Sequence, residues 1–578
     1  MTYPSLFREG LFIFGCMENK IIARTLRLLS SLLELHDENP FKVKSVANAA
    51  FKVDKLPYPI YTKSLAEMEQ IDGLGKSIAS KINELIQTSS IQELADLIKV
   101  TPPGIIEMMQ IKGIGPKKIL VIWKDLGIDT VGELYYACNE NRLIEAKGFG
   151  LKTQEEIKQK IEFNMASNGR FLYAKVENLA EELLNLAKKV FNTEQIYCTG
   201  QFRRKCEIID SLDFLIVGQA NEEIKEELIL NGLENAEING QEIKCNTESG
   251  LSIYFTFCHS EELGKKLIVK TGSEEHTNSI FSILGEADLK DKSEKQIYEV
   301  AGLSFIEPEL REGTNEIELA KSNKLPELIE YADLKGSLHN HSTWSDGIHT
   351  LEEMAVYCRN ELNLEYVGIC DHSKSAFYAN GLSDLRVAAQ QREIDELNIK
   401  LAPFKIFKGI ESDILYDGSL DYSNEVLSSF DFVVASVHSI LNMTEEKATE
   451  RLIKAIENPY TTILGHPTGR LLLSRSGYPI NHKKVIDACA ANNVIIEINA
   501  NPLRLDLDWR WHQYAISNGV LLSINPDAHR VEGHLDMKYG TLIARKGGIS
   551  RLNCLNAMNL EQICRVFEQQ KTKLHLEK

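Results

Sequence analysis

The C-terminal part of the sequence holds the pattern that most constrains the fold, because short apolar runs alternate with helical stretches from about Leu334 onward. Such runs match buried β-strands, and strands separated by helices form parallel sheets. At this length the alternation predicts a parallel α/β domain, with a barrel as the favoured architecture. The predicted strands are Tyr366–Cys370, Phe432–Ala435, Thr462–Gly465, Val494–Ile498 and Leu521–Ile524.

Residues that commonly bind metal ions follow these apolar runs. In α/β barrels the active site forms at the carboxyl ends of the strands. Two pairs in the set are spaced two residues apart, which places both side chains of a pair on one face of an extended segment. Imidazole and carboxylate groups together suit Zn²⁺, Mn²⁺ or Fe²⁺. The candidates are His339, His341, Asp346, Asp371, His372, Glu411, His438, His466, Asp527 and His529.

Each of these residues, taken alone, has a simpler interpretation. A single histidine after a strand is more often a hydrogen-bonded structural residue, and Asp346 between Ser345 and Gly347 is typical of a turn. However, six of the fourteen histidines fall at predicted strand ends. This concentration favours a shared site for two or three ions, which can hold a phosphate between them and generate hydroxide at neutral pH.

The N-terminal third repeats one local pattern three times: an apolar residue, a Gly-apolar-Gly turn and the start of a helix with lysine nearby. The glycines allow a tight turn, and the helix that follows offers free N–H groups to a phosphate. Each copy alone could be an ordinary glycine-capped helix end. Three copies, each with lysine, resemble helix-hairpin-helix motifs that hold the DNA backbone without reading sequence. The predicted DNA-binding residues are Gly73, Gly75, Lys76, Gly113, Gly115, Lys117, Gly148, Gly150 and Lys152.

Composition restricts the other possibilities. No apolar run approaches the roughly 18 residues that span a bilayer, and residues 11–16 are too short for a signal peptide and follow Glu9 rather than a basic flank. Eleven cysteines without a CxxC pair argue against a disulfide framework and a thiolate zinc site. We therefore expect a cytoplasmic protein. The net charge of −18 is unusual for a DNA-binding protein, but it is a sum over several domains and includes carboxylate ligands.

Several segments of the first two thirds carry a resemblance to one family. They are Asn19–Ala23, Glu38–Val43, Gly200–Lys205, Asp210–Val217, Thr271–His276 and Ile297–Glu312. These segments resemble bacterial family X DNA polymerases (PolX), in which the chain begins about where Met17 lies. The resemblance implies that residues 1–16 are an extension or a misassigned start. Gln70 stands where eukaryotic relatives carry a Schiff-base lysine, so no 5′-lyase activity by that route is expected.

The resemblance implies a multidomain fold. A helical DNA-binding domain with the first hairpin would cover residues 17–90, and an all-α helix-hairpin-helix region residues 91–168. An α+β nucleotidyltransferase-like palm and thumb would cover residues 169–320. The C-terminal α/β barrel with parallel strands would cover residues 334–578.

The nucleotidyltransferase signature of the family is incomplete in this chain. Its chemistry needs two carboxylates two residues apart on a strand and a third on a neighbouring strand, to hold two divalent ions. Ser211 stands at the first position and Tyr254 at the third, so only Asp213 matches, unless a β-bulge brings in Asp210. Gln201 replaces a serine that grips the triphosphate. We predict that templated synthesis is lost or severely reduced, and the residual site comprises Gly200, Arg203, Arg204 and Asp213.

The candidate metal ligands resemble those of the PHP (polymerase and histidinol phosphatase) domain, which follows the polymerase lobe in bacterial PolX. All nine family positions are filled, and Glu411 would be the bridging carboxylate. The resemblance implies catalytic roles for Glu411, His341 and Asp527. The nine matching ligands are His339, His341, Asp346, His372, Glu411, His438, His466, Asp527 and His529.

Two stretches, Gly465–Arg470 and Asn499–Asp506, are close to the PolX-specific form of this domain. Arg470 and Arg504 are therefore candidate phosphate contacts, unless they form structural ion pairs. Ser337 replaces an aspartate that usually precedes the first ligand pair, and this change is expected to weaken the orientation of a ligand. Pro526 replaces a threonine at a position that is not a ligand.

Together these features predict a DNA repair or DNA-end-processing protein, a metal-dependent 3′–5′ exonuclease or phosphoesterase with a degenerate polymerase lobe. The expected cofactors are two or three divalent ions, Mn²⁺ or Zn²⁺, with Fe²⁺ or Mg²⁺ as alternatives. The expected partner is gapped, nicked or 3′-ended duplex DNA, with no membrane and a monomeric chain. The alternatives are an active DNA polymerase with a proofreading exonuclease and a small-molecule phosphatase of the histidinol-phosphatase type. A pure DNA-binding scaffold conflicts with the full ligand set.

Overall fold

A computed structural model describes residues 18–109, 111, 114–144, 146, 148–166 and 169–576 of the chain. The predicted extension of residues 1–16 and the predicted DNA contact Gly113 lie outside these described residues. The chain divides into two compact units, which are described separately. One comprises Met1–Cys138 with Leu143–Ile161, and the other Asn139–Arg142 with Glu162–Lys578.

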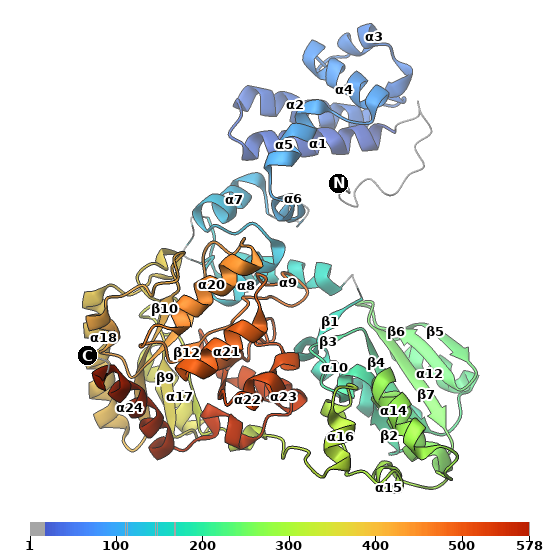
Figure 1. Cartoon of the computed structure of the whole chain (residues 1–578). Helices are drawn as coiled ribbons and strands as arrows, with labels where there is room; N and C mark the ends of the chain where they lie inside the picture. The colour runs from blue at the N-terminus through green and yellow to red at the C-terminus, as the bar shows by residue number, and fades with distance from the viewer. Residues whose placement is uncertain are drawn as a thin grey trace. The chain divides into compact units, whose positions relative to one another are not determined.

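The first unit is helical (Figure 1). Its longest helix, α1, buries Ile22, Leu26, Leu29 and Leu33 along one face, at the three- and four-residue spacing of an amphipathic helix. Helix α2 begins after Asn39, whose side chain accepts a hydrogen bond from the backbone N–H of Phe41. The helices are α1 (Asn19–Leu35), α2 (Pro40–Lys55), α3 (Leu65–Glu69), α4 (Lys76–Thr88), α5 (Gln92–Val100), α6 (Pro103–Met108), α7 (Pro116–Leu120), α8 (Val131–Asn139) and α9 (Leu151–Ala166).

The second unit begins with a palm-like lobe. Within the described residues its larger sheet has five strands in the order β2-β4-β7-β6-β5, in which β4 and β7 are parallel and the other pairs antiparallel. Helix α10 (Tyr173–Val190) packs on its apolar face, and helices α13–α16 form a separate core. The strands are β2 (Ile196–Cys198), β4 (Ser211–Val217), β5 (Glu234–Asn239), β6 (Glu242–Asn246) and β7 (Ser252–Cys258), and the helices α11 (Gly200–Arg203), α12 (Glu222–Leu230), α13 (Leu263–Thr271), α14 (Glu274–Leu284), α15 (Glu294–Val300) and α16 (Glu316–Lys321).

The rest of the second unit is a parallel barrel. Its seven strands within the described residues follow the chain order from β8 to β14, and every neighbouring pair is parallel. Just beyond the two outer strands, Asn340 pairs with Ala528, and the backbone N–H of His341 donates to the Ala528 carbonyl at 2.8 Å. The predicted parallel α/β barrel is thereby confirmed. The strands are β8 (Gly336–Ser337), β9 (Tyr366–Ile369), β10 (Lys405–Asp413), β11 (Phe432–Ser436), β12 (Ile463–Leu464), β13 (Ile495–Asn499) and β14 (Leu522–Asn525).

Helices surround the strands, and the last helix packs on aromatic residues of the barrel (Figure 1). Phe567 stacks on Phe432 at 5.1 Å between ring centroids, with Ile563 in the same core. Because Phe432 opens β11, this aromatic contact lies at the amino end of that strand. The helices are α17 (Leu351–Asn360), α18 (Asp384–Leu401), α19 (Asn424–Leu427), α20 (Glu445–Ile456), α21 (His482–Asn492), α22 (His512–Ser517), α23 (Met537–Lys546) and α24 (Leu560–Leu576).

Ion pairs join the palm-like lobe to the barrel within the second unit. Arg545 of α23 contacts Glu309 at 2.8 Å, and Lys546 contacts Glu312, which also accepts from Arg204 at 2.8 Å. Lys546 is 1% exposed at its side chain, so this contact is buried. The lobe therefore has a structural connection to the barrel that does not depend on polymerase chemistry.

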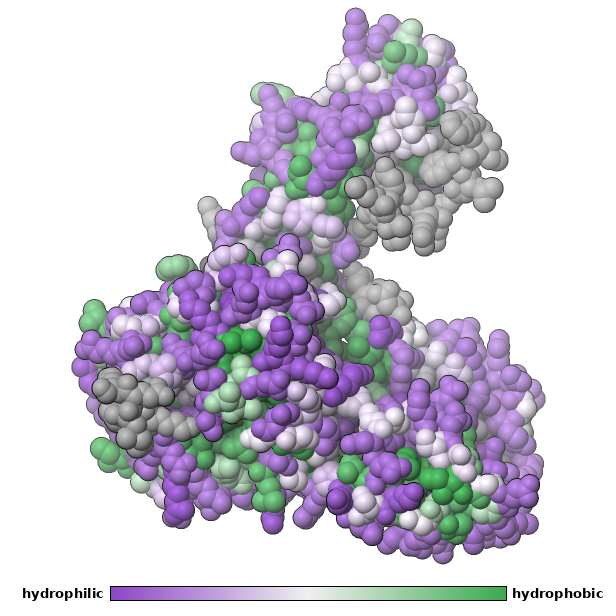
Figure 2. All heavy atoms as spheres, viewed as in Figure 1, coloured by the Kyte–Doolittle hydropathy of each residue, from purple (hydrophilic) through white to green (hydrophobic). Residues whose placement is uncertain are grey.

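No helix among the described residues combines the length and the apolar character that a membrane crossing requires. Hydrophilic residues cover most of the face shown in Figure 2.

Candidate metal centre

The carboxyl ends of the barrel strands deliver nine metal-binding side chains to one place. One comes from strand β10 itself, and the others lie in the loops that follow β8, β9, β11, β12 and β14. His339 and Asp527 adopt positive φ angles of 58° and 55°, so the chain turns sharply at both positions. Seven of the nine residues are buried, and the side chains of Asp346 and His438 are 9% and 11% exposed. The structure thus brings together the whole predicted set. Their role as ligands stays a prediction.

Glu411 occupies the middle of the cluster, with a side-chain exposure of 1%. Its Oε1 atom lies 3.1 Å from Nε2 of His438, 3.1 Å from Nε2 of His466 and 3.2 Å from Nε2 of His339. Its Oε2 atom lies 2.9 Å from Nδ1 of His372 and 3.6 Å from Nε2 of His341. A carboxylate that faces five imidazoles from four loops could bridge more than one cation, which is the role predicted for Glu411.

Asp346 and Asp527 form two further acidic points. Asp346 lies 3.6 Å from Nε2 of His372 and 3.5 Å from Nε2 of His529. Asp527 Oδ1 lies 3.1 Å from Nε2 of His341. The three carboxylates and six imidazoles therefore form one continuous cluster rather than separate ion pairs.

The electrostatics of the cluster follow from burial and close opposite charges. Burial disfavours the charged form of His438, but the carboxylates of Glu411 and Asp413 outweigh it and raise its pKa to about 10. Burial and the neighbouring imidazoles lower the pKa of His341 to about 4. Burial also opposes ionisation of Glu411, but the surrounding imidazoles hold its pKa well below the ordinary value. Ionised carboxylates thus face imidazoles whose protons a cation can replace.

The donor set fits divalent metal ions. The cluster contains three overlapping groups of potential ligands, and within each group the ligand atoms lie within 4.8 Å of one another. Nδ1 of His341 and Oδ2 of Asp346 are buried without a hydrogen-bond partner among the described residues, a costly arrangement that a cation would relieve. Nitrogen and oxygen donors without thiolate suit Mn²⁺, Zn²⁺ or Fe²⁺. The groups are His341, Asp346, His372 and His529; His339, His341 and Asp527; and His372, Glu411 and His438.

Sequence reasoning missed the carboxylates that orient these ligands. Glu497 of β13 accepts from Nδ1 of His339 at 2.6 Å, and Asp413 of β10 contacts Nδ1 of His438 at 2.5 Å. Such contacts fix the tautomer and the ring orientation of a ligating histidine. Asp413 follows Glu411 by two residues on the same strand, so the spacing rule that found the ligands could also have found it.

A third carboxylate, Asp371, positions the loop that carries Asp346. It accepts hydrogen bonds from the backbone N–H of Ser342 at 2.8 Å and of Ser345 at 3.1 Å, and from the side chain of Gln390 at 2.6 Å. Asp371 was a candidate ligand because it precedes His372. The structure places it in loop support, outside the three groups of potential ligands.

The two predicted phosphate contacts lie in different surroundings. Arg504 is 5% exposed at its side chain, with Nε 3.9 Å from Oδ2 of Asp527. Arg470 pairs with Asp508 and donates from Nε to the Arg504 carbonyl at 2.9 Å, which is the structural pairing considered as its alternative role. Ser337 donates to Asn340 at 3.1 Å and contacts none of the ligands in the described structure.

The polymerase-like site keeps one carboxylate in the predicted register. Asp213 of β4 pairs directly with Tyr254 of the parallel strand β7, and Ser211 donates to Asp213 at 2.8 Å. Burial raises the pKa of Asp213. Asp210 precedes the strand, and its carboxylate contacts the side chain of Gln201 at 2.9 Å. The position predicted for a third carboxylate therefore holds a phenol.

The two predicted arginines of this site have protein partners. Arg203 forms two hydrogen bonds with the carboxylate of Glu294, at 3.0 and 2.6 Å. Arg204 contacts Glu312 at 2.8 Å and the Thr271 carbonyl at 2.7 Å. Gly200 has a φ of 61°, and a Cβ there would lie 2.7 Å from Oδ2 of Asp213. These residues hold the lobe together in this structure.

The three hairpins of the first unit share one turn geometry. Leu74, Ile114 and Phe149 each donate a backbone hydrogen bond to the residue three positions earlier, at 2.9, 3.2 and 3.1 Å. Gly73 and Gly148 have φ angles of 86° and 88°, which explains the glycines. A Cβ at Gly75, Gly115 or Gly150 would meet nothing within 4 Å. Lys76, Lys117 and Lys152 are exposed.

Parts of the chain are similar to known families and proteins. A family model described as a helix-hairpin-helix domain matches residues 17–91, and one described as a SAM-like helix-hairpin-helix tandem matches residues 105–162. A probable phosphatase from Acetivibrio thermocellus is 33% identical over 168 residues, which cover 28% of this chain and 63% of that protein. A probable phosphatase from Caldanaerobacter subterraneus is 36% identical over 111 residues, 18% of this chain and 41% of that protein.

A further relative matches the chain almost from end to end. The protein named DNA polymerase/3′-5′ exonuclease PolX from Bacillus subtilis is 34% identical over 570 residues, which cover 95% of this chain and 99% of the relative. The match includes the hairpins, the palm-like lobe and the barrel, because it extends over nearly the whole sequence. The chain therefore belongs to the bacterial PolX family.

Proposed function

We propose that this protein shortens or trims DNA 3′ ends by metal-dependent phosphodiester hydrolysis at the barrel, and that its palm-like lobe does not extend primers. The observation that carries the proposal is the convergence of six imidazoles and three carboxylates around Glu411. Bound divalent ions, Mn²⁺ or Zn²⁺ in the first place, would supply an activated water and neutralise phosphate charge. A role in DNA repair or end processing follows.

The chain's own residues divide the work. Glu411 and Asp527 would hold the cations, and His341 belongs to two of the donor groups. Glu497 and Asp413 keep the imidazoles of His339 and His438 in one orientation. Arg504 is close enough to Asp527 to add positive charge beside a bound phosphate. Burial of this set excludes bulk water and strengthens every electrostatic contact.

The loss of polymerase activity rests on charge. Two divalent ions between a nucleotide and a primer need several carboxylates to hold them, and a hydroxyl and a phenol do not compensate their charge. Ser211 and Tyr254 occupy two of the three positions, and the partners of Arg203 and Arg204 are glutamates of the same lobe. The lobe would then serve as a scaffold for DNA and for the barrel.

The substrate assignment rests on the hairpins. Three equivalent turns, each with an exposed lysine at the start of the following helix, suit sequence-independent contacts to a phosphate backbone. We propose gapped, nicked or 3′-ended duplex DNA as the partner, bound by a monomer.

A primer–template assay tests the proposal. Labelled primer–template would be incubated with Mn²⁺, with and without dNTPs, beside His339→Ala and Asp213→Ala variants. We expect shortening that His339→Ala abolishes and Asp213→Ala preserves, with no extension in any lane. Extension by the unmodified protein that Asp213→Ala removes would contradict the polymerase part, and intact primer in every lane would contradict the nuclease part.

Two other functions have specific support. The name of the Bacillus subtilis relative favours an active polymerase with an exonuclease, and the relatives named probable phosphatases favour a small-molecule phosphatase. Primer extension in the presence of dNTPs would support the active polymerase. Hydrolysis of histidinol phosphate with no shortening of DNA would decide the second.

A further inference from the structure

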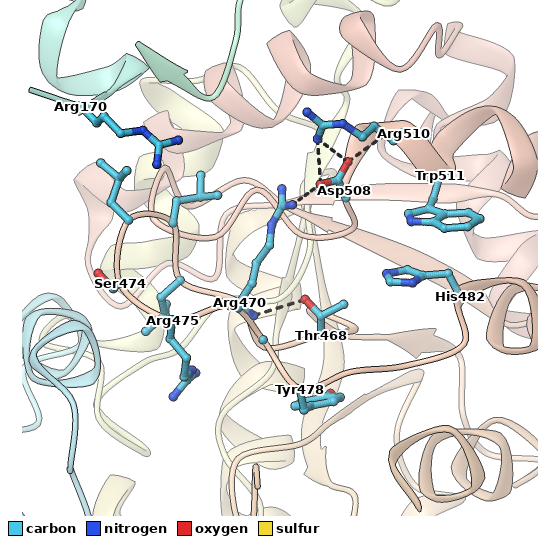
Figure 3. A pocket seen from close by; sticks show the side chains of 15 residues that line it. Arg170, Thr468, Arg470, Ser474, Arg475, Tyr478, His482, Asp508, Arg510 and Trp511 are labelled. Atoms are coloured by element: carbon cyan, nitrogen blue, oxygen red, sulfur yellow. Dashed lines mark hydrogen bonds and ion pairs between the residues drawn. The ribbon is translucent and has the colours of Figure 1, made fainter. Parts of the chain in front are cut away.

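A cavity of about 770 Å³ is lined mainly by the loops that follow β12 and β13. Figure 3 shows its lining side chains. Apart from His482, the charged residues that line the cavity are four arginines and one aspartate. The lining is therefore positive, although the whole chain has a net charge of −18. The arginines are Arg170, Arg470, Arg475 and Arg510, and the aspartate is Asp508.

The wall of the cavity is continuous with the metal centre. Its first lining residue on the β12 loop, Thr468, follows the predicted ligand His466 by two positions. Buried Asp506 accepts hydrogen bonds from the backbone N–H and hydroxyl of Thr468, both at 2.9 Å, and from the N–H of Gly469 at 3.0 Å. The Arg470 guanidinium donates to the carbonyl of Arg504, whose own side chain reaches Asp527. The loops that line the cavity are thereby connected to the residues of the metal centre.

One side of the cavity presents an aromatic surface. Trp511 and His482 lie against each other in Figure 3. Their rings stack with centroids 4.7 Å apart and an interplanar angle of 4°. Burial lowers the pKa of His482, so the stacked pair is uncharged at neutral pH. Arg470 and Arg510 both contact Asp508 near this surface, and Arg510 also pairs with Glu207 at 3.2 Å. Arg170 comes from the palm-like lobe and pairs with Asp210 at 3.3 Å. The side chains of Arg170 and Arg510 are each 57% exposed, so both remain accessible to a ligand.

We infer that this cavity binds one nucleotide of the DNA strand whose end the barrel processes, with the base against Trp511 and the phosphate beside Arg170 and Arg510. The inference rests on the proposed function. The volume suits a nucleotide rather than a lone phosphate. Aromatic faces beside arginines are typical of sites for single-stranded nucleic acid, where stacking and phosphate contacts act together. The palm-like lobe then contributes to substrate binding through Arg170, without any polymerase chemistry.

Binding of a short single strand tests the inference. A labelled phosphorothioate tetrathymidylate, which resists hydrolysis, would be titrated with the full-length protein in fluorescence anisotropy. We expect Trp511→Ala to weaken binding by roughly 5- to 150-fold, because stacking contributes about 1–3 kcal/mol per base. Arg510→Gln should reduce the slope of log affinity against log salt concentration by about 0.7. Arg565→Gln, which removes an exposed arginine from α24, is the matched control and should bind like the unmodified protein.

Each other outcome has a definite meaning. Equal binding by Trp511→Ala, Arg510→Gln and the control would overturn the inference. Displacement of the tetrathymidylate by thymidine monophosphate or inorganic phosphate at equal affinity would also overturn it, because the occupant would then be a free nucleotide or a phosphate. If the variants bind weakly as expected but the unmodified protein with Mn²⁺ leaves primer–template intact, the proposed function fails and the nucleotide site stands.

Discussion

The barrel and the palm-like lobe each carry a carboxylate on a pair of parallel strands, but the two carboxylates have different partners. In the barrel, Glu411 faces five imidazoles, and buried donor atoms lack hydrogen-bond partners among the described residues. In the lobe, Asp213 receives a hydrogen bond from Ser211 and stands opposite Tyr254. Under the proposed function, the first arrangement would gain stability from cations, whereas Asp213 in the second already has a hydrogen-bond partner in the protein.

The largest expected effect on activity comes from a substitution in the metal centre of the barrel. Glu411→Gln removes the central charge that faces His339, His438 and His466. We expect DNA shortening to fall by more than about 100-fold, since loss of a ligand should exceed the effect of losing its supporting residue. Calorimetric titration with Mn²⁺ should also show fewer sites. Asp213→Asn is the control and should change neither measurement; unchanged Mn²⁺ binding by Glu411→Gln would contradict the assignment of the centre.

A smaller loss of metal affinity is expected when the residue that orients a candidate ligand is changed. Glu497→Gln keeps the shape of the side chain but removes the charge that orients His339. We expect a loss of about 10- to 100-fold in metal affinity, with activity recovered at higher Mn²⁺ concentration. Activity that does not recover with added Mn²⁺ would show that Glu497 acts on the substrate or on folding instead.

Carboxylates can be introduced into the palm-like lobe to test whether it then binds divalent ions. In the Ser211→Asp/Tyr254→Asp double variant, three carboxylates would face one side of the sheet and repel one another. We expect its melting temperature to be lower without divalent ions and to rise by several degrees with Mn²⁺, and weak primer extension to appear. The same Mn²⁺ response in Asp213→Asn combined with both substitutions would show that the effect comes from elsewhere.

The last expected effect concerns stability rather than activity, and it depends on the ion pairs within the lobe. Burial opposes ionisation of Glu294, but Arg203 and Arg311 outweigh it and lower its pKa from 4.5. Because the folded pKa is depressed, this stabilisation is present above about pH 4.5 and is lost as the pH falls below it. Glu294→Gln should lower stability at pH 7 by about 3 kcal/mol and flatten the acid limb of a melting-temperature profile. A profile with the same slope in both proteins would contradict the role of Glu294.

Much of the barrel could be predicted from the sequence, because strand-helix alternation and ligand spacing are local signals. His339 with His341 and Asp527 with His529 show the two-residue spacing directly. The support by Glu497 could not be predicted in this way, because it joins residues 158 positions apart. Arg470 was predicted as a phosphate contact, and its pairing with Asp508 depends on how two loops meet.

The cavity had no sequence signal of its own. Arg170 and Arg510 belong to different domains, and only the packing of the lobe on the barrel brings both to one cavity. In the lobe, by contrast, the resemblance to the nucleotidyltransferase signature located Ser211 and Tyr254, and the structure pairs Tyr254 with Asp213. Local periodicity thus predicts which residues share a strand face, and tertiary packing decides which distant residues share a site.

Anomalous diffraction from crystals soaked in Mn²⁺ tests the contrast between the two regions most directly. We predict two or three peaks around Glu411, within coordination distance of the imidazoles of the barrel, and none beside Asp213. A peak beside Asp213, or an empty cluster around Glu411, would contradict the account.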